Sequence, residues 1–338
     1  MTQNIDVHWH HVPQPFVKAV ADGKVPLKGR YELDDRGEPE IKVDLGFREF
    51  TQELPPRLCE VEAAIEHMDR VGLDVVAPSV APPLMHYLAG AEEGLKVSQV
   101  MNDAMAEVMS PHARRFRPLA NVPLQDPEAA AKELRRAMVD LGFAGAQIGT
   151  HVGGRNLGDK ELRPFWEAVA ELDAFIFLHP SPPPLGLREG RINRHDMGNF
   201  VGLPIESACA LASLMFDGVY EDVGPLNTCF AHGGGAFPYI ISRWEHGYEA
   251  RLAPRNPPMK NPYSYLDSVY ADSLTHSPKA LRFLLEILGE DHVMLGSDYP
   301  FDMGVDDPVA AMHEAIEAGP VRDKVAGGNA AKLLGMTD

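Results

Sequence analysis

Eight short runs of strand-forming residues, spread over the whole chain, constrain this fold more than any other feature of the sequence. We predict strands at Ile5–His10, Val75–Ser79, Arg117–Val122, Gly145–Gly149, Phe175–His179, Thr228–His232, Val269–Asp272 and Val293–Ser297. Several of these runs are continuously apolar, which is typical of strands buried on both faces. Amphipathic segments lie between them, such as residues 61–72 and 126–142, and each of these two ends on a glycine. Eight strands alternating with helices predict an α/β fold, a (β/α)8 TIM barrel.

An open, doubly wound parallel sheet is the main alternative to the barrel. The first strand lacks the G-x-G-x-x-G turn that would favour a dinucleotide-binding sheet. A chain of 338 residues can form two domains or one large barrel, and we expect one barrel domain over residues 1–338. Residues 22–57 interrupt the alternation, because they are polar and rich in glycine, proline and charge. We expect them to form an inserted lobe or flap after strand 1.

The charge and cysteine content exclude several classes of partner. A formal net charge of −18 argues against binding to nucleic acid or to an anionic membrane surface. No apolar stretch approaches the length needed to span a membrane, and the N-terminus does not resemble a signal peptide. The three cysteines lie far apart and form no C-x-x-C pair, which fits a reducing compartment. We therefore expect a cytoplasmic protein that acts on a small molecule.

Histidines and one aspartate stand at the carboxyl ends of predicted strands. His8 and His10 end the first strand, His179 ends the fifth, His232 ends the sixth, and Asp298 follows the eighth. In a barrel of this kind, polar residues at these ends face the active site. A single histidine there is most often structural, but five such residues together indicate a metal site.

The spacing in the first strand supports the metal site. Strand side chains alternate between faces, so His8 and His10 point the same way while Trp9 points the opposite way. His11 falls on the other face, and we exclude it as a ligand. Imidazole nitrogen with carboxylate oxygen is the donor set expected for Zn²⁺, with Mn²⁺, Fe²⁺ or Co²⁺ possible.

Other residues follow the predicted strands without forming a clear pattern. His151 and His276 come after strands 4 and 7, where either could line the pocket or serve packing. The 181–200 loop carries Arg188, Arg191 and Arg194, which form either an exposed basic turn or part of an anion-binding wall.

Five sequence blocks resemble the amidohydrolase-related decarboxylases. The blocks are IDVHWHHVP, GTHVGGRNL, FLHP, FAHGGGAFPYIISRWEHG and VMLGSDYPFDMG, and the resemblance runs from about residue 4 to residue 335. The AHGGGAFP and LGSDYPF blocks are more specific to this family than H-x-H alone. One departure is Asn199 and Phe200, which stand where the resemblance implies a tryptophan-rich segment.

The resemblance implies a role for each matching residue. His8, His10, His179 and Asp298 match zinc ligands, Asp298 being catalytic as well. His232 matches the catalytic histidine that activates metal-bound water and moves protons. Arg48 and Phe301 fall among the substrate-binding residues. Arg243 matches an arginine donated across a homodimer interface to the substrate, and a planar guanidinium suits a carboxylate because it can donate two parallel hydrogen bonds.

The implied function is metal-dependent, non-oxidative decarboxylation of a conjugated or aromatic carboxylic acid. A metal-dependent hydrolase or hydratase of a small carboxylated ring or dienoate is the first alternative, because the same ion can activate water for attack on carbon. A metal-binding protein without catalysis is the second, and it would not need His232.

Overall fold

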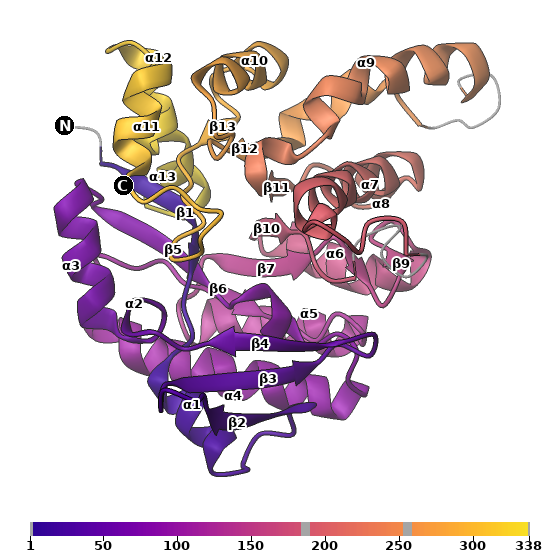
Figure 1. Cartoon of the computed structure of the whole chain (residues 1–338). Helices are drawn as coiled ribbons and strands as arrows, with labels where there is room; N and C mark the ends of the chain where they lie inside the picture. Colours follow the sequence, from indigo (N-terminus) through magenta and orange to yellow (C-terminus); the bar gives the residue numbers. More distant parts are fainter. Residues whose placement is uncertain (1–2, 184–189, 253–258, 337–338) are drawn as a thin grey trace.

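The computed structural model describes residues 3–183, 190–252 and 259–336, and it is built around eight parallel strands (Figure 1). These strands are β1 (Ile5–His10), β5 (Val75–Ser79), β6 (Leu119–Asn121), β7 (Gly145–Gly149), β10 (Phe175–His179), β11 (Asn227–Phe230), β12 (Val269–Asp272) and β13 (Val293–Met294). β1 pairs with β5, and the other six pair in the order β6, β7, β10, β11, β12, β13. Each of these pairings is parallel.

Backbone hydrogen bonds close these two sheets into one barrel. Val76 of β5 receives a hydrogen bond from Arg117 and donates one to Arg115, at 2.9 and 3.0 Å, which links β5 to the segment before β6. On the other side, Val7 of β1 donates to the carbonyl of Leu295, just after β13, at 2.9 Å. The predicted barrel is therefore confirmed, and the open sheet is excluded.

Helices surround the strands (Figure 1). They are α1 (Gln14–Ala21), α2 (Pro56–Cys59), α3 (Val61–Val71), α4 (Ala91–Met109), α5 (Pro127–Val139), α6 (Arg163–Glu171), α7 (Leu203–Phe216), α8 (Val219–Val223), α9 (Phe237–Gly247), α10 (Pro278–Leu288), α11 (Pro308–Ala315), α12 (Pro320–Asp323) and α13 (Asn329–Leu333). The sequence signals explain their ends. Asp126 caps α5 by accepting from the amide of Ala129 at 3.1 Å, and Gly72 ends α3 in the left-handed region at φ 74°.

The alternation along β1 divides the interior of the barrel from its outer core. Trp9 faces outward and is fully buried, with its ring 4.1 Å from that of Tyr299 and 5.6 Å from that of His67. The neighbouring His8 and His10 face the interior. One strand therefore supplies both the packing that holds it and the polar groups of the site.

Residues 22–57, the predicted insertion, contain a three-stranded antiparallel sheet: β2 (Gly29–Leu33), β3 (Pro39–Asp44) and β4 (Glu49–Glu53). Ile41 and Val43 of β3 are fully buried in a second apolar cluster that includes Phe16 of α1 and Met101 of α4. The amide of Lys28 donates to His86 Nε2 at 3.0 Å, which ties the insertion to the loop after β5. The insertion is thus a packed layer beside the barrel (Figure 1). A role as a flap stays a prediction.

Among the described residues, one helical segment has the length and apolar composition to cross a membrane, Gly198–Phe216. Half of it is buried inside the molecule, and its second part, α7, contributes Leu211 and Leu214 to the main core. Its apolar character is explained by this packing.

Candidate metal centre and active site

Five side chains predicted from strand ends converge at the carboxyl end of the barrel. His8 and His10 are fully buried, and His179 and Asp298 are nearly so. The imidazole rings lie 5.0–5.2 Å apart between centroids in the pairs His8–His10, His8–His179, His8–His232, His10–His179 and His179–His232. Residues from four strand ends therefore line one small space.

Hydrogen bonds fix the orientation of three of these rings. His8 Nδ1 lies 2.6 Å from Asp272 Oδ2, His10 Nδ1 lies 3.1 Å from the carbonyl of Val80, and His179 Nδ1 lies 2.9 Å from the carbonyl of Pro180. All three partners are acceptors, so each Nδ1 carries the hydrogen. In the neutral imidazoles each Nε2 then presents a lone pair.

These lone pairs face a carboxylate. Asp298 Oδ1 lies 3.1 Å from His8 Nε2 and 3.0 Å from His10 Nε2, and none of these three buried atoms has a hydrogen-bond partner. A buried set of nitrogen lone pairs and carboxylate oxygen, all acceptors, is stable only around a cation. The donor set of imidazole nitrogens and one carboxylate fits a divalent transition metal such as Zn²⁺ or Mn²⁺.

The pKa shifts agree with a site built for positive charge. Burial lowers the pKa of His8, but Asp298 and Asp272 outweigh it and raise that pKa to about 10. Burial would raise the pKa of Asp298, yet the histidines around it hold the value well below its usual range. Burial, and then the neighbouring histidines, push the pKa of His179 well below its usual value, so its imidazole stays neutral.

His232 and Asp298 differ from the sequence prediction in their backbone. The sixth and eighth strands end earlier than predicted, at Phe230 and Met294, so His232 begins a short 3-10 helix, His232–Gly234, and Asp298 lies in the loop after β13. Both adopt left-handed φ angles, 59° and 61°, which non-glycine residues rarely do and which cluster at functional sites. His232 Nε2 lies 3.4 Å from Asp298 Oδ2. The ligand atoms of His8, His179, His232 and Asp298 all lie within 4.8 Å of one another. His232 is therefore close enough to bind the same ion or to act on a group bound to it, whereas the predicted ligand His10 is not part of this tighter set.

Sequence reasoning missed Asp272, the last residue of β12. Its carboxylate is fully buried and accepts from His8 Nδ1 at 2.6 Å. The signal was available, because Asp272 ends the predicted seventh strand, as His179 ends the fifth. Position alone, however, does not separate a residue that contacts the ion from one that holds a ligand.

The predicted substrate-binding residues lie at different distances from this cluster. The ring of Phe301 lies 5.1 Å from that of His10, at the edge of the site. Arg48 is exposed in the turn between β3 and β4, its guanidinium 5.7 Å from the Phe47 ring. Arg243 is exposed on α9, and the described part of the chain shows no hydrogen bond or ion pair from either arginine side chain. Within the described part of the single chain, Phe301 contacts the histidine cluster and neither arginine does.

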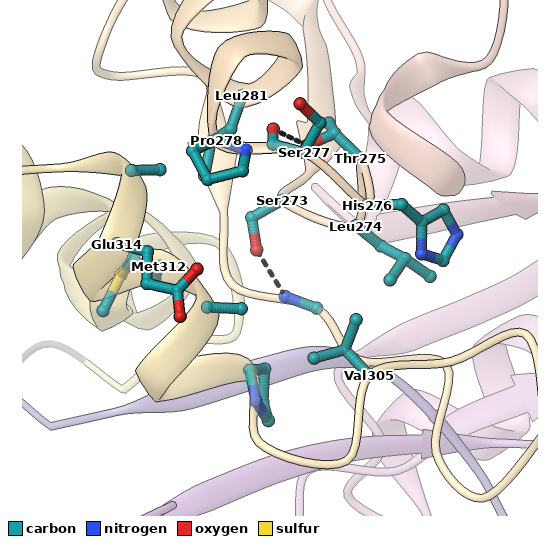
Figure 2. Close-up of a pocket in the computed structure, with 14 residues that line it drawn as sticks. Ser273, Leu274, Thr275, His276, Ser277, Pro278, Leu281, Val305, Met312 and Glu314 are labelled. Atoms are coloured by element: carbon teal, nitrogen blue, oxygen red, sulfur yellow. Dashed lines mark hydrogen bonds between the residues drawn. The ribbon is translucent and has the colours of Figure 1, made fainter.

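The remaining candidates are also placed. His151 is buried, accepts from the amide of Gly154 at its Nδ1 and donates from Nε2 to the carbonyl of Pro183 at 3.1 Å. It lines a small cavity between the insertion and the loops after β5, β7 and β10. His276 is exposed and lines a separate cavity of about 220 Å³ between the loops after β12 and β13 (Figure 2). Arg191 and Arg194 are exposed, and Arg188 lies outside the described residues.

Comparison with known proteins gives consistent matches. The sequence matches the amidohydrolase family over residues 5–336. It is 34% identical over 340 residues to 2-amino-3-carboxymuconate-6-semialdehyde decarboxylase of Dictyostelium discoideum, a match that covers 98% of this chain and 91% of that protein. It is 27% identical to gamma-resorcylate decarboxylase of Rhizobium sp., over 83% of this chain and 88% of that protein.

A solved structure adds a ligand-bound relative. The 5-carboxyvanillate decarboxylase of Novosphingobium aromaticivorans, complexed with manganese and 4-hydroxy-3-methoxy-5-nitrobenzoic acid, is similar with a TM-score of 0.80 at 25% identity. The alignment covers 99% of this chain and 96% of that one.

The closed barrel and the acceptor cluster at its carboxyl end define a metal-dependent barrel enzyme. The chain belongs to the amidohydrolase family, within which it is a metal-dependent carboxy-lyase, a non-oxidative decarboxylase. The predicted family and reaction class are confirmed, and the hydrolase or hydratase alternative is not favoured.

Proposed function

We propose that this enzyme decarboxylates a conjugated or aromatic acid related to 2-amino-3-carboxymuconate-6-semialdehyde, with Zn²⁺ as its metal. The observation that carries the proposal is the convergence of three imidazoles on the Asp298 carboxylate. Nε2 of His8 and of His10 lies 3.1 and 3.0 Å from Asp298 Oδ1, and the His179 ring lies 5.2 and 5.1 Å from those two rings. Three nitrogens and one oxygen are a common donor set for Zn²⁺, and Mn²⁺, Fe²⁺ and Co²⁺ are the alternatives. The relatives with the same reaction class act on conjugated or aromatic acids.

We assign His8, His10, His179 and Asp298 as ligands and His232 as the group that moves the proton. When bound, the metal supplies positive charge and lowers the pKa of a water molecule at the site. The His232 side chain is 19% exposed, the largest value among the five residues, so it can reach a substrate at the open side of the cluster. Burial restricts the other histidines to holding the ion.

The proton step follows from the chemistry of decarboxylation. A proton is added to the carbon that bears the carboxylate, which interrupts the conjugation there. The bond to the carboxylate carbon then breaks, its electron pair returns to the π-system, and CO₂ leaves. His232 delivers this proton and then takes up another proton from solvent. Phe301, beside His10, packs against the unsaturated part of the substrate.

Arg48 and Arg243 bind the substrate carboxylate in this proposal, with Arg243 contributed by the second subunit of a homodimer. The support is the position of Arg243, exposed on α9, which extends away from the barrel (Figure 1). Tyr239, one helical turn earlier on the same face, is 82% exposed, and Phe200 is 57% exposed. Exposed aromatic side chains of this kind are typical of protein interfaces.

We also propose that the enzyme is cytoplasmic, because its three cysteines are few and form no C-x-x-C pair, which fits a reducing compartment.

The reaction is tested by product analysis with a panel of muconate-type and aromatic acids. We expect one CO₂ released per substrate consumed, with the hydrogen that replaces the carboxylate coming from solvent, as ²H₂O labelling would show. A product that gained water and kept its carboxylate would contradict the proposal and favour the hydratase alternative.

A further inference from the structure

We propose that Asp272 is a positioning residue that couples the metal ligand His8 to the proton-transferring His232, an inference that rests on the proposed function. Asp272 ends β12 and is fully buried. Both of its carboxylate oxygens already accept hydrogen bonds from groups of the chain, so they are not free to bind the ion. Its role follows from the groups that its two oxygens bind.

Both carboxylate oxygens of Asp272 act only as acceptors. Oδ2 accepts from His8 Nδ1 at 2.6 Å and from the backbone amide of His232 at 2.9 Å. Oδ1 accepts from the amides of Gly233 at 2.7 Å and Leu274 at 3.1 Å. Four donors converge on one side chain, so a side chain with a hydrogen on either oxygen, or with an amide in place of one, cannot satisfy them all.

These bonds have two consequences for the site. The bond to His8 fixes the tautomer that leaves Nε2 free to face Asp298, which is how an outer carboxylate orients a metal-bound imidazole. The bonds to His232 and Gly233 hold the backbone of His232 in its left-handed conformation, which is unfavourable without such support. One carboxylate thus sets the direction of a ligand and the place of the proton-transferring histidine.

A glycine packs closely against this pair. A Cβ atom on Gly296 would lie 2.7 Å from Cβ of Asp272, closer than real Cβ contacts occur, and 3.0 Å from Cβ of His8, which is tighter than most. The amide of Gly296 donates to Ser273 Oγ at 3.2 Å, which joins the loops after β12 and β13 (Figure 2). A side chain at position 296 would therefore displace Asp272 or His8, and glycine leaves the space that their contact needs.

The test compares Asp272→Asn with Asp126→Asn, a matched control at the N-cap of α5. In Asp272→Asn, the side-chain NH₂ group replaces one oxygen and faces the two donors that this oxygen accepted from. In Asp126→Asn, the remaining side-chain oxygen can still cap the helix. We expect Asp272→Asn to weaken Zn²⁺ or Mn²⁺ binding by about 10- to 100-fold, measured by chelator competition on the purified chain. We also expect it to change the visible spectrum of the Co²⁺-substituted protein, and Asp126→Asn to change neither.

A second variant covers the case in which Asp272→Asn fails to fold. Gly296→Ala keeps every polar group but forces Asp272 away from His8, so it should also lower metal affinity and shift the Co²⁺ spectrum. If a folded Asp272→Asn or Gly296→Ala protein melts earlier but binds metal as the wild type does, with an unchanged Co²⁺ spectrum, the inference is wrong. A wild-type chain that binds no divalent ion would instead overturn the proposed function.

Discussion

At the scale of single residues, the direction of each imidazole matters more than its presence. His10 and His11 are adjacent and both fully buried, yet only His10 has a ring nitrogen held by a carbonyl and the other facing Asp298. Neither ring nitrogen of His11 has a hydrogen-bond partner, and burial lowers its pKa to about 3, so it is neutral near pH 7. Alternation along the strand explains the difference.

This difference gives a paired prediction. His10→Ala removes a proposed ligand. It should weaken metal binding by at least about 100-fold, which is the largest loss expected when only a residue that orients a ligand is removed. His11→Ala deletes a ring of similar size on the opposite face and should leave metal affinity within about threefold, although both variants lose stability through the cavity formed. Chelator competition measures both. Equal losses of affinity in the two variants would show that His10 is not a ligand.

The sequence was sufficient to find the five converging residues, because strand ends in a barrel share one face. It was insufficient for their roles. The left-handed backbone of His232 depends on bonds to Asp272, which lies 40 residues away. The proposed contact of Arg243 with a substrate involves a second subunit, so it does not follow from the strand and helix pattern of one chain.

At the scale of elements, the insertion is held to the barrel by a histidine that must stay neutral. His86 Nε2 accepts from the amide of Lys28, so it has no room for a second ring hydrogen. Burial, together with Lys28, lowers the pKa of His86 from 6.5 to about 4. The composition of residues 22–57 predicted an inserted lobe or flap. It did not predict the hydrogen bond between Lys28 and His86, since His86 lies well beyond the insertion in the chain.

The lowered pKa predicts a pH dependence of stability. Because the unfolded chain protonates His86 below about pH 6.5 and the folded chain only near pH 4, acidification favours unfolding across that window. The stabilisation is almost complete at pH 7.5, begins to fall as the pH drops through 6.5, and roughly 2 kcal/mol of it should be lost by about pH 5. Urea unfolding of the metal-free protein measures this loss.

The matched variant is His86→Asn, because asparagine tolerates the left-handed backbone at this position, φ 62°. Its free energy of unfolding should fall less than that of the wild type over the same pH range. Parallel pH profiles for the two proteins would show that His86 does not protonate on unfolding in this window.

At the scale of the whole molecule, the proposed site needs two chains. If Arg48 acts in its own subunit and Arg243 acts in the partner's site, Arg48→Ala and Arg243→Ala should each abolish most activity. Mixing them in equal amounts gives about half hybrid dimers, and each hybrid holds one site with both arginines. We therefore expect roughly a quarter of wild-type activity to return. A mixture that stays inactive, with subunit exchange shown by mass spectrometry, would exclude donation across the interface.

The central claim is that four side chains hold a catalytic metal while His232 moves the proton. The measurement that tests it most directly is metal content and CO₂ release of wild type and His232→Ala, measured on the same purified samples. The account predicts about one zinc per chain in both proteins and CO₂ release from the wild type alone. Loss of the metal together with activity would make His232 a ligand, and a wild type without metal would contradict the account altogether.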